Sequence, residues 1–139
     1  MRFATVFAAT AFGAFAAASE QIQIQDLTIR EVKSIQAASF KIQPANVECA
    51  STSADELAGN KVVTCGETKY RFAVQRSQPE VRDSTKGITA QYDLTIYKET
   101  GLAAGITGTL KVGAYCAAGN DGPYSFVCTP VEEVSGVIY

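Results

Sequence analysis

The chain has 139 residues, a formal net charge of −2 at pH 7, four cysteines, no histidine and no tryptophan. This length fits one domain. The absence of histidine excludes Ser-His-Asp and Cys-His sites and any zinc site that needs imidazole, and the acidic balance argues against nucleic-acid binding, which needs a basic face.

The N-terminus has the pattern of a secretory signal peptide. Arg2 precedes an uncharged run rich in Phe and Ala over residues 3–15, and three alanines at 16–18 offer small residues for cleavage. A membrane anchor is the alternative, but the run is shorter than the ~20 residues that span a bilayer. We therefore expect residues 1–18 to be removed, and residues 19–139 to form one extracellular domain that does not span the membrane.

The four cysteines all lie in the expected mature chain, at positions 49, 65, 116 and 128. An even count in an exported protein predicts two disulfides, for which three pairings exist. We favour Cys49–Cys65 with Cys116–Cys128, because each pair brackets two short strand-like segments and a turn. Their spacing lacks the close C-x-x-C pairs of a metal site.

From residue 21 onwards, short segments of alternating or β-branched residues follow one another, separated by turn signals. The alternation slips near Asp26, as at a β-bulge. We expect one helical turn at 54–57, loops or turns at 77–87, 101–105 and 119–123, and a final strand at the C-terminus. The other strands are expected at residues 21–30, 40–43, 47–49, 61–65, 69–76, 90–98, 106–112 and 126–128. The prediction is an all-β fold, a compact antiparallel β-barrel or sandwich of about 8–11 short strands.

The acidic pairs Asp55-Glu56 and Glu132-Glu133 are the only adjacent carboxylates that invite a catalytic interpretation. A glycosidase needs two carboxylates facing each other across the scissile bond, whereas neighbours on a strand point to opposite faces. The segment 119–123 lacks the Lys-Ser/Thr of a P-loop and the carboxylates of a calcium loop. We therefore predict no enzymatic activity, no cofactor and no metal.

A small basic and aromatic surface is the best candidate for contact with a partner. Lys69 and Arg71, with Lys61, are predicted on a solvent-facing side, where simple solubility is the alternative role. Tyr70 and Tyr92 fit the core. Tyr97 and Tyr124 are expected to be exposed, and tyrosine is enriched at binding hot spots.

Two segments carry a resemblance to a known family. The stretch 49–67, which ends Thr-Cys-Gly-Glu, and the stretch 115–128, which reads YCAAGNDGPYSFVC, are similar to the Alternaria major allergen family of small secreted fungal proteins. The resemblance extends over about residues 47–139. It implies a compact antiparallel β-barrel, both favoured disulfides, and secretion by a filamentous ascomycete.

The resemblance also implies function. Family members are linked to the plant hypersensitive response, to binding of thaumatin-like defence proteins, and to carriage of small phenolic ligands. We expect a secreted effector or elicitor, extracellular or cell-wall associated, whose partner is a plant host protein, either a membrane receptor or a thaumatin-like protein. The alternatives are a carrier of a small apolar ligand such as a flavonoid, and an enzyme acting on cell-wall sugar.

The chain departs from the family at one point. The dimeric allergen has an extra cysteine near its mature N-terminus that bridges two subunits, whereas residues 19–48 contain none here. We therefore predict a monomer, without the ligand cavity that the dimer provides.

Overall fold

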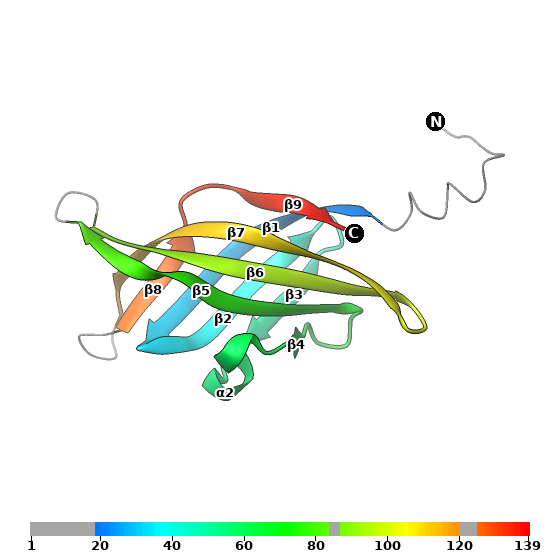
Figure 1. Ribbon diagram of the computed structural model, residues 1–139, viewed down its shortest axis with the longest axis horizontal. Helices are drawn as coiled ribbons and strands as arrows, with labels where there is room; N and C mark the ends of the chain where they lie inside the picture. The colour runs from blue at the N-terminus through cyan, green and yellow to red at the C-terminus, as the bar shows by residue number, and fades with distance from the viewer. Residues whose placement is uncertain (1–18, 84–86, 120–124) are drawn as a thin grey trace.

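The computed structural model describes residues 19–83, 87–119 and 125–139, so the predicted signal peptide at 1–18 lies outside the described residues. The described chain is almost entirely β-strand (Figure 1). The elements, in chain order, are β1 (Glu20–Val32), β2 (Ser34–Gln43), β3 (Val47–Ser51), the helical turn α2 (Ala54–Leu57), the 3-10 turn η1 (Ala58–Asn60), β4 (Val63–Thr64), β5 (Tyr70–Asp83), β6 (Gly87–Gly101), β7 (Ala104–Ala118), β8 (Ser125–Pro130) and β9 (Val134–Ile138).

The strands form one antiparallel sheet that curls into a nearly closed barrel. Its order is β3-β2-β1-β8-β7-β6-β5-β4, and β9 also pairs with β1. β8 pairs with residues 29–32 of β1 and β9 with residues 20–24, so the two short strands follow each other alongside β1. Backbone hydrogen bonds between Thr107 and Tyr139, at 3.0 and 3.2 Å, tie the chain end to β7. The predicted C-terminal strand is confirmed.

The barrel is open between β3 and β4, the two strands at the ends of the sheet. The Cys49–Cys65 disulfide joins β3 to the residue that follows β4, and α2 and η1 pack against β2 and β5 beside this seam. Cys116–Cys128 joins directly opposed residues of β7 and β8. The structure thus has the pairing that the sequence favoured.

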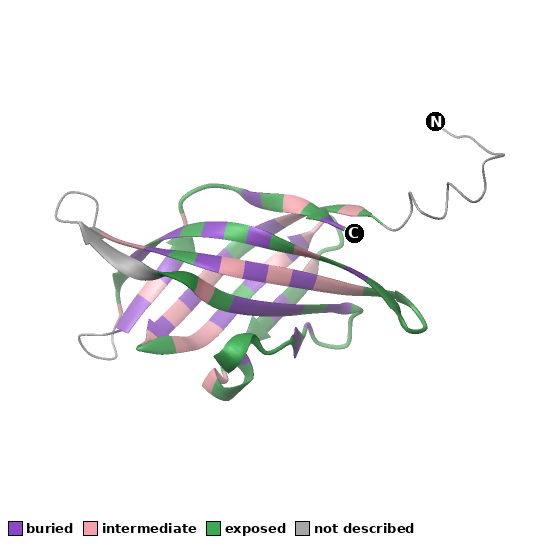
Figure 2. Cartoon of the chain, in the orientation of Figure 1, coloured by how far each residue is buried: buried purple, intermediate pink, exposed green. Residues whose placement is uncertain are grey.

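The core fills the interior of the barrel with the inward residues of each strand. Figure 2 shows buried and exposed positions alternating along the strands, as the sequence pattern predicts. Tyr92, Phe40 and Phe72 are the largest fully buried side chains, and the two phenyl rings meet edge to face with centroids 5.0 Å apart. Tyr70 and Tyr92 are buried, as expected.

Several local predictions are confirmed. Asp26 has a φ of 57°, and the β1–β2 register shifts between Gln25 and Thr28, where the sequence indicated a bulge. The helical turn at 54–57 forms, and the Ser53 side chain accepts a hydrogen bond from the backbone N–H of Glu56.

The loop predicted at 77–87 is wrong, because β5 continues to Asp83 and β6 begins at Gly87; residues 84–86 lie outside the described residues. Register shifts on either side of Gln78 leave Ser77 and Pro79 out of the ladder with β6. A proline is tolerated at such a bulge because no ladder hydrogen bond needs its missing N–H. The central strands are longer than the sequence indicated, at 14 residues in β5 and 15 in β6 and β7.

No helix in the described ranges is long and apolar enough to cross a lipid bilayer.

Candidate functional site

A hollow on the outside of the barrel brings together three of the four residues predicted to contact a partner. It lies where β5 begins and where β6 turns into β7, and it has a volume of about 410 Å³. We call it the Tyr97 hollow; it is lined by Lys69, Arg71, Tyr97, Lys98, Glu99, Ala103, Ala104, Gly105, Ile106 and Thr107. The fourth predicted residue, Tyr124, lies outside the described residues.

The register of three strands positions the side chains of the hollow. Arg71 lies opposite Tyr97 in the β5–β6 ladder, and Tyr97 lies opposite Thr107 in the β6–β7 ladder. The flanking residues Phe72 and Ile96 are fully buried. Because successive residues of a strand point to opposite faces, Arg71, Tyr97 and Thr107 form one row across the outer surface. Tyr97 is half-buried in this row and Arg71 is exposed.

The hollow carries two cations that form no ion pair within the described part of the chain. Lys69 and Arg71 are exposed, and the ion pairs found in that part involve other residues. Glu99 lies beside Lys69, since its backbone N–H donates to the Lys69 carbonyl at 2.9 Å. The hollow therefore offers two positive groups, one carboxylate, an aromatic ring and the Thr107 hydroxyl.

Lys98 lines the same hollow but is engaged on the other side of the sheet. Its ammonium lies 2.5 Å from a carboxylate oxygen of Glu20, and the Tyr70 hydroxyl donates to the same carboxyl group. The hydrogen bond to Glu20 raises the pKa of Lys98 above its ordinary 10.5. Burial alone raises the pKa of Glu20, but the hydrogen bonds from Lys98 and Tyr70 outweigh it, and the pKa lies below 4.5. Lys98 thus has a structural role, because its ion pair with Glu20 connects β6 to the start of β1.

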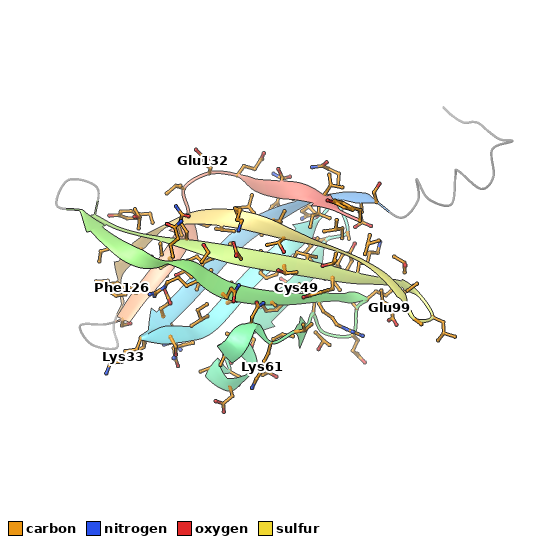
Figure 3. The ribbon with its side chains drawn as sticks, viewed as in Figure 1. Lys33, Cys49, Lys61, Glu99, Phe126 and Glu132 are labelled. Carbon is orange, nitrogen blue, oxygen red and sulfur yellow. A yellow bond between two sulfur atoms is a disulfide. The ribbon has the colours of Figure 1, made fainter. Side chains whose placement is uncertain are left out.

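Lys61, which the sequence grouped with Lys69 and Arg71, is placed elsewhere. Its ammonium donates to the Asp55 carbonyl at 3.1 Å, and it does not line the Tyr97 hollow. Figure 3 shows Lys61 beside α2 and Glu99 toward the β6–β7 hairpin. The predicted basic surface therefore reduces to two cations on one strand end.

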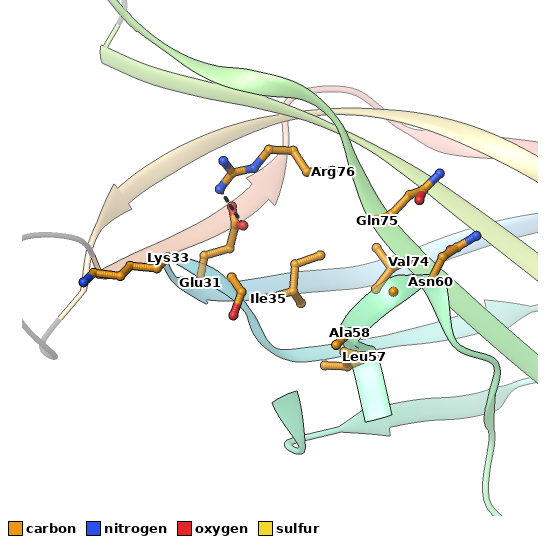
Figure 4. Close-up of a pocket in the computed structure, with 11 residues that line it drawn as sticks. Glu31, Lys33, Ile35, Leu57, Ala58, Asn60, Val74, Gln75 and Arg76 are labelled. Atoms are coloured by element: carbon orange, nitrogen blue, oxygen red, sulfur yellow. Dashed lines mark ion pairs between the residues drawn. The ribbon is translucent and has the colours of Figure 1, made fainter. Parts of the chain in front are cut away.

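A second hollow, with a volume of about 310 Å³, lies between the β1–β2 turn, the α2–η1 segment and β5 (Figure 4). Apolar side chains of Ile35, Leu57 and Val74 line it, and a charged pair, Glu31 and Arg76, lies beside them. A guanidinium nitrogen of Arg76 is 2.5 Å from a Glu31 carboxylate oxygen, and Glu31 is only 3% exposed. We call this the Arg76 hollow.

Tyr92 completes this polar cluster from inside the barrel. Its hydroxyl donates to the second carboxylate oxygen of Glu31 at 2.5 Å and lies 3.4 Å from the sulfur of Cys128. Burial, the larger cause, and the hydrogen bond to Glu31, the smaller, both raise the pKa of Tyr92 well above its ordinary 10.0. The phenol therefore stays protonated and acts as a donor. Each of the two carboxylate oxygens of Glu31 thus has a donor, as a buried carboxylate requires.

Glu31 and Arg76 are not among the site residues predicted from the sequence. The signal that was available is that each charged residue takes an inward position in its strand, two residues after buried Ile29 and Val74 respectively. A charge at such a position predicts a buried partner, because an unpaired charge is costly there.

The acidic pairs are placed on the surface. Glu132 and Glu133 lie in the exposed connection between β8 and β9, and Glu133 accepts a hydrogen bond from Gln23 at 2.5 Å. Glu56, within α2, accepts a hydrogen bond from the Ser51 hydroxyl at 2.7 Å. Neither pair lines the Tyr97 or the Arg76 hollow. In the part of the chain that is described, no cluster of three carboxylate or thiol residues is suited to hold a metal ion. The turn predicted at 119–123 falls almost wholly outside that part.

Comparisons with known proteins agree with this architecture. The chain is 32% identical to the effector protein PevD1 of Verticillium dahliae over an alignment that covers 99% of this chain and 94% of the relative. Two crystal structures of the Alternaria alternata allergen Alt a 1 share the fold. One has a TM-score of 0.60 and 22% identity, covering 84% of this chain and 86% of the allergen chain. The other has a TM-score of 0.56 and 20% identity, with coverages of 85% and 89%.

The family model described as Alternaria alternata allergen 1 matches residues 24–128 of the chain. This match spans the barrel from β1 into β8, including both disulfides. Together with the similarity to the Verticillium effector over nearly the whole chain, it shows that the chain belongs to the Alternaria alternata allergen 1 family.

Proposed function

We propose that this protein is a secreted fungal effector that acts outside the fungal cell and is recognised by a plant host. The observation that carries the proposal is the 32% identity to the effector protein PevD1 across 99% of the chain. The signal-like residues 1–18 and the two disulfides support an extracellular site of action, because disulfides persist in oxidising compartments.

The barrel serves as a rigid scaffold, and its outer surface makes the contacts. The interior is filled by Tyr92, Phe40 and Phe72, which are at most 2% exposed, so recognition falls to surface side chains. Of the predicted contact residues, Lys69, Arg71 and Tyr97 line one hollow, which supports their role in binding an acidic host component. The expected partners are a host membrane receptor or a thaumatin-like defence protein, met in the extracellular space or at the cell wall.

The filled interior favours this function over carriage of a small apolar ligand. A carrier needs a concave apolar site that covers most of its ligand, whereas the Tyr97 and Arg76 hollows each include charged residues in their lining. Titration with a fluorescent flavonoid separates the two functions, since an effector that works through its surface does not require such binding.

Leaf infiltration with purified protein tests the effector function. We expect the oxidised protein to induce defence, seen as an oxidative burst or as hypersensitive cell death, and the reduced and unfolded protein to induce much less. Lys69→Glu with Arg71→Glu should weaken the response. The control is Lys41→Glu with Lys61→Glu, which changes the charge equally at lysines outside the hollow. The absence of any response in several hosts contradicts the proposal.

A further inference from the structure

The Tyr97 hollow has a chemistry that selects among acidic ligands, and we propose that it binds a carboxylated sugar chain, a polyuronate. This inference rests on the proposed function and specifies the ligand class of its contact surface. The volume of about 410 Å³ lies within the range of ~300–1,000 Å³ that is usual for small-ligand sites.

Two exposed cations line the hollow close enough together for one anionic chain to contact both. Arg71 is the second residue of β5 and Lys69 immediately precedes the strand, and both are exposed. The Cα atoms of residues two positions apart are separated by at most about 7 Å. Neither is neutralised by an ion pair within the described ranges, whereas Lys98 next to them is held by Glu20 at 2.5 Å. An anionic chain running along β5 therefore meets two accessible positive groups.

Tyr97 and the small residues of the β6–β7 hairpin provide a surface on which a sugar ring can pack. Tyr97 lies directly opposite Arg71, and the hairpin residues Ala103, Ala104 and Gly105 line the hollow beyond it. These small residues leave the half-buried tyrosine open to a ligand, and the hairpin extends from the barrel at this end (Figure 1). A sugar ring packs its C–H face on an aromatic side chain, while the Thr107 hydroxyl offers a hydrogen bond.

Glu99 discriminates a sugar from an acidic peptide. Glu99 lines the hollow and its backbone lies beside that of Lys69, so its negative charge repels a ligand that presents only carboxylates there. A polyuronate also carries hydroxyl groups, which donate to Glu99 while its carboxylates bind the two cations. The mixture of two cations, one carboxylate and one aromatic ring thus fits a sugar acid better than an acidic protein segment.

The test is titration calorimetry of the purified, oxidised protein with oligogalacturonate. Methyl-esterified oligogalacturonate serves as the uncharged sugar, and poly-L-glutamate as the acidic peptide. We expect binding of oligogalacturonate alone, and weakening with added salt because the contacts are electrostatic. Lys69→Gln with Arg71→Gln should lower affinity at least about tenfold, since charge-assisted hydrogen bonds are lost. Lys41→Gln with Lys61→Gln, which removes two charges elsewhere, should change it by less than about threefold.

Tyr97 provides a second, independent variant. Tyr97→Phe should retain binding because the ring remains, and Tyr97→Ser should lose most of it, with circular dichroism showing that both variants are folded. Equal binding of the methyl ester, preferred binding of poly-L-glutamate, or equal loss in the two double variants overturns the inference. A wild-type protein that induces the leaf response without binding oligogalacturonate overturns it too, and leaves the effector function intact.

Discussion

Glu31 of β1 and Arg76 of β5 form an ion pair with 2.5 Å between oxygen and nitrogen, although their strands are not neighbours in the sheet. The pair connects the strands across the barrel, and the Tyr92 hydroxyl adds a hydrogen bond from β6. The buried carboxylate of Glu31 therefore connects β1, β5 and β6, which are far apart in the sequence.

Removing the arginine should destabilise the protein strongly. Arg76→Met leaves Glu31 buried without its cation, which costs about 3 kcal/mol, at the lower end for broken buried pairs because Arg76 is partly exposed. Lys111→Met is the matched control. It breaks the Lys111–Asp93 pair, in which the lysine side chain is 79% exposed, and should cost less than ~1 kcal/mol. Urea unfolding measures both, and equal losses would disprove the structural role of the buried pair.

The Glu20–Lys98–Tyr70 cluster should make stability depend on acid pH. The pKa of Glu20 is lowered in the folded protein, so its contribution is complete above its unfolded value near 4.5 and is lost as the pH falls through the folded value. The difference in unfolding free energy between wild type and Glu20→Gln should be constant near neutral pH and shrink below about pH 4.5. A difference that grows toward acid pH would contradict this sign.

The two disulfides should differ in their effect on the barrel. Cys49–Cys65 spans the seam between β3 and β4, which are not paired with each other, whereas Cys116 and Cys128 are already neighbours in the β7–β8 ladder. We expect Cys49→Ala with Cys65→Ala to cost about 3 kcal/mol and to raise amide exchange in β3 and β4. Cys116→Ala with Cys128→Ala should leave exchange at the seam unchanged. Denaturant unfolding and hydrogen exchange of both variants check this, and equal seam exchange would contradict it.

Gly108 should be required for β9 to pack closely against β7. A Cβ atom there would lie 2.7 Å from the Val137 carbonyl oxygen and 3.2 Å from the Ile138 Cα, both backbone atoms. Gly108→Ala should therefore push β9 outward and destabilise by about 1–3 kcal/mol. Gly113→Ala is the control, because the nearest atom is a Val131 methyl at 3.8 Å. Thermal unfolding distinguishes them, and a neutral Gly108→Ala would show that β9 does not pack as described.

The protein should be a monomer in solution. All four cysteines are used in two disulfides within the chain, and residues 19–48 contain none. Non-reducing electrophoresis should show one band at the monomer mass, and analytical ultracentrifugation should give the same mass. A covalent dimer band, or a dimer in the ultracentrifuge, would contradict the prediction.

Most of the strands could be predicted because their signals are local. The alternation of the large apolar residues Tyr70, Phe72 and Val74 with smaller or polar neighbours assigns faces without knowledge of the rest of the chain. The extension of β5 past Ser77 could not be predicted in this way. Pro79 is a strong loop signal, and only the pairing with β6 across two register shifts makes a strand acceptable there.

The candidate site was predicted in part. The sequence identified Lys69, Arg71 and Tyr97 as residue types that bind partners, but their grouping into one hollow depends on the register of β5 with β6. The sequence prediction also included Lys61, whose ammonium instead donates a hydrogen bond to the Asp55 carbonyl in α2. Glu99 was missed because nothing in its own segment indicates that it lines the same hollow as Lys69 and Arg71.

The β class, the inward and outward faces of most strands and a favoured disulfide pairing are predictable from the sequence alone, since they depend on patterns within a few residues and on the positions of the cysteines. The pairing of the strands, the closure of the seam and the ion pair between Glu31 and Arg76 become visible only in the folded structure. Such contacts join residues far apart in the chain, and their formation depends on the free energy of the whole closed barrel rather than on local preference.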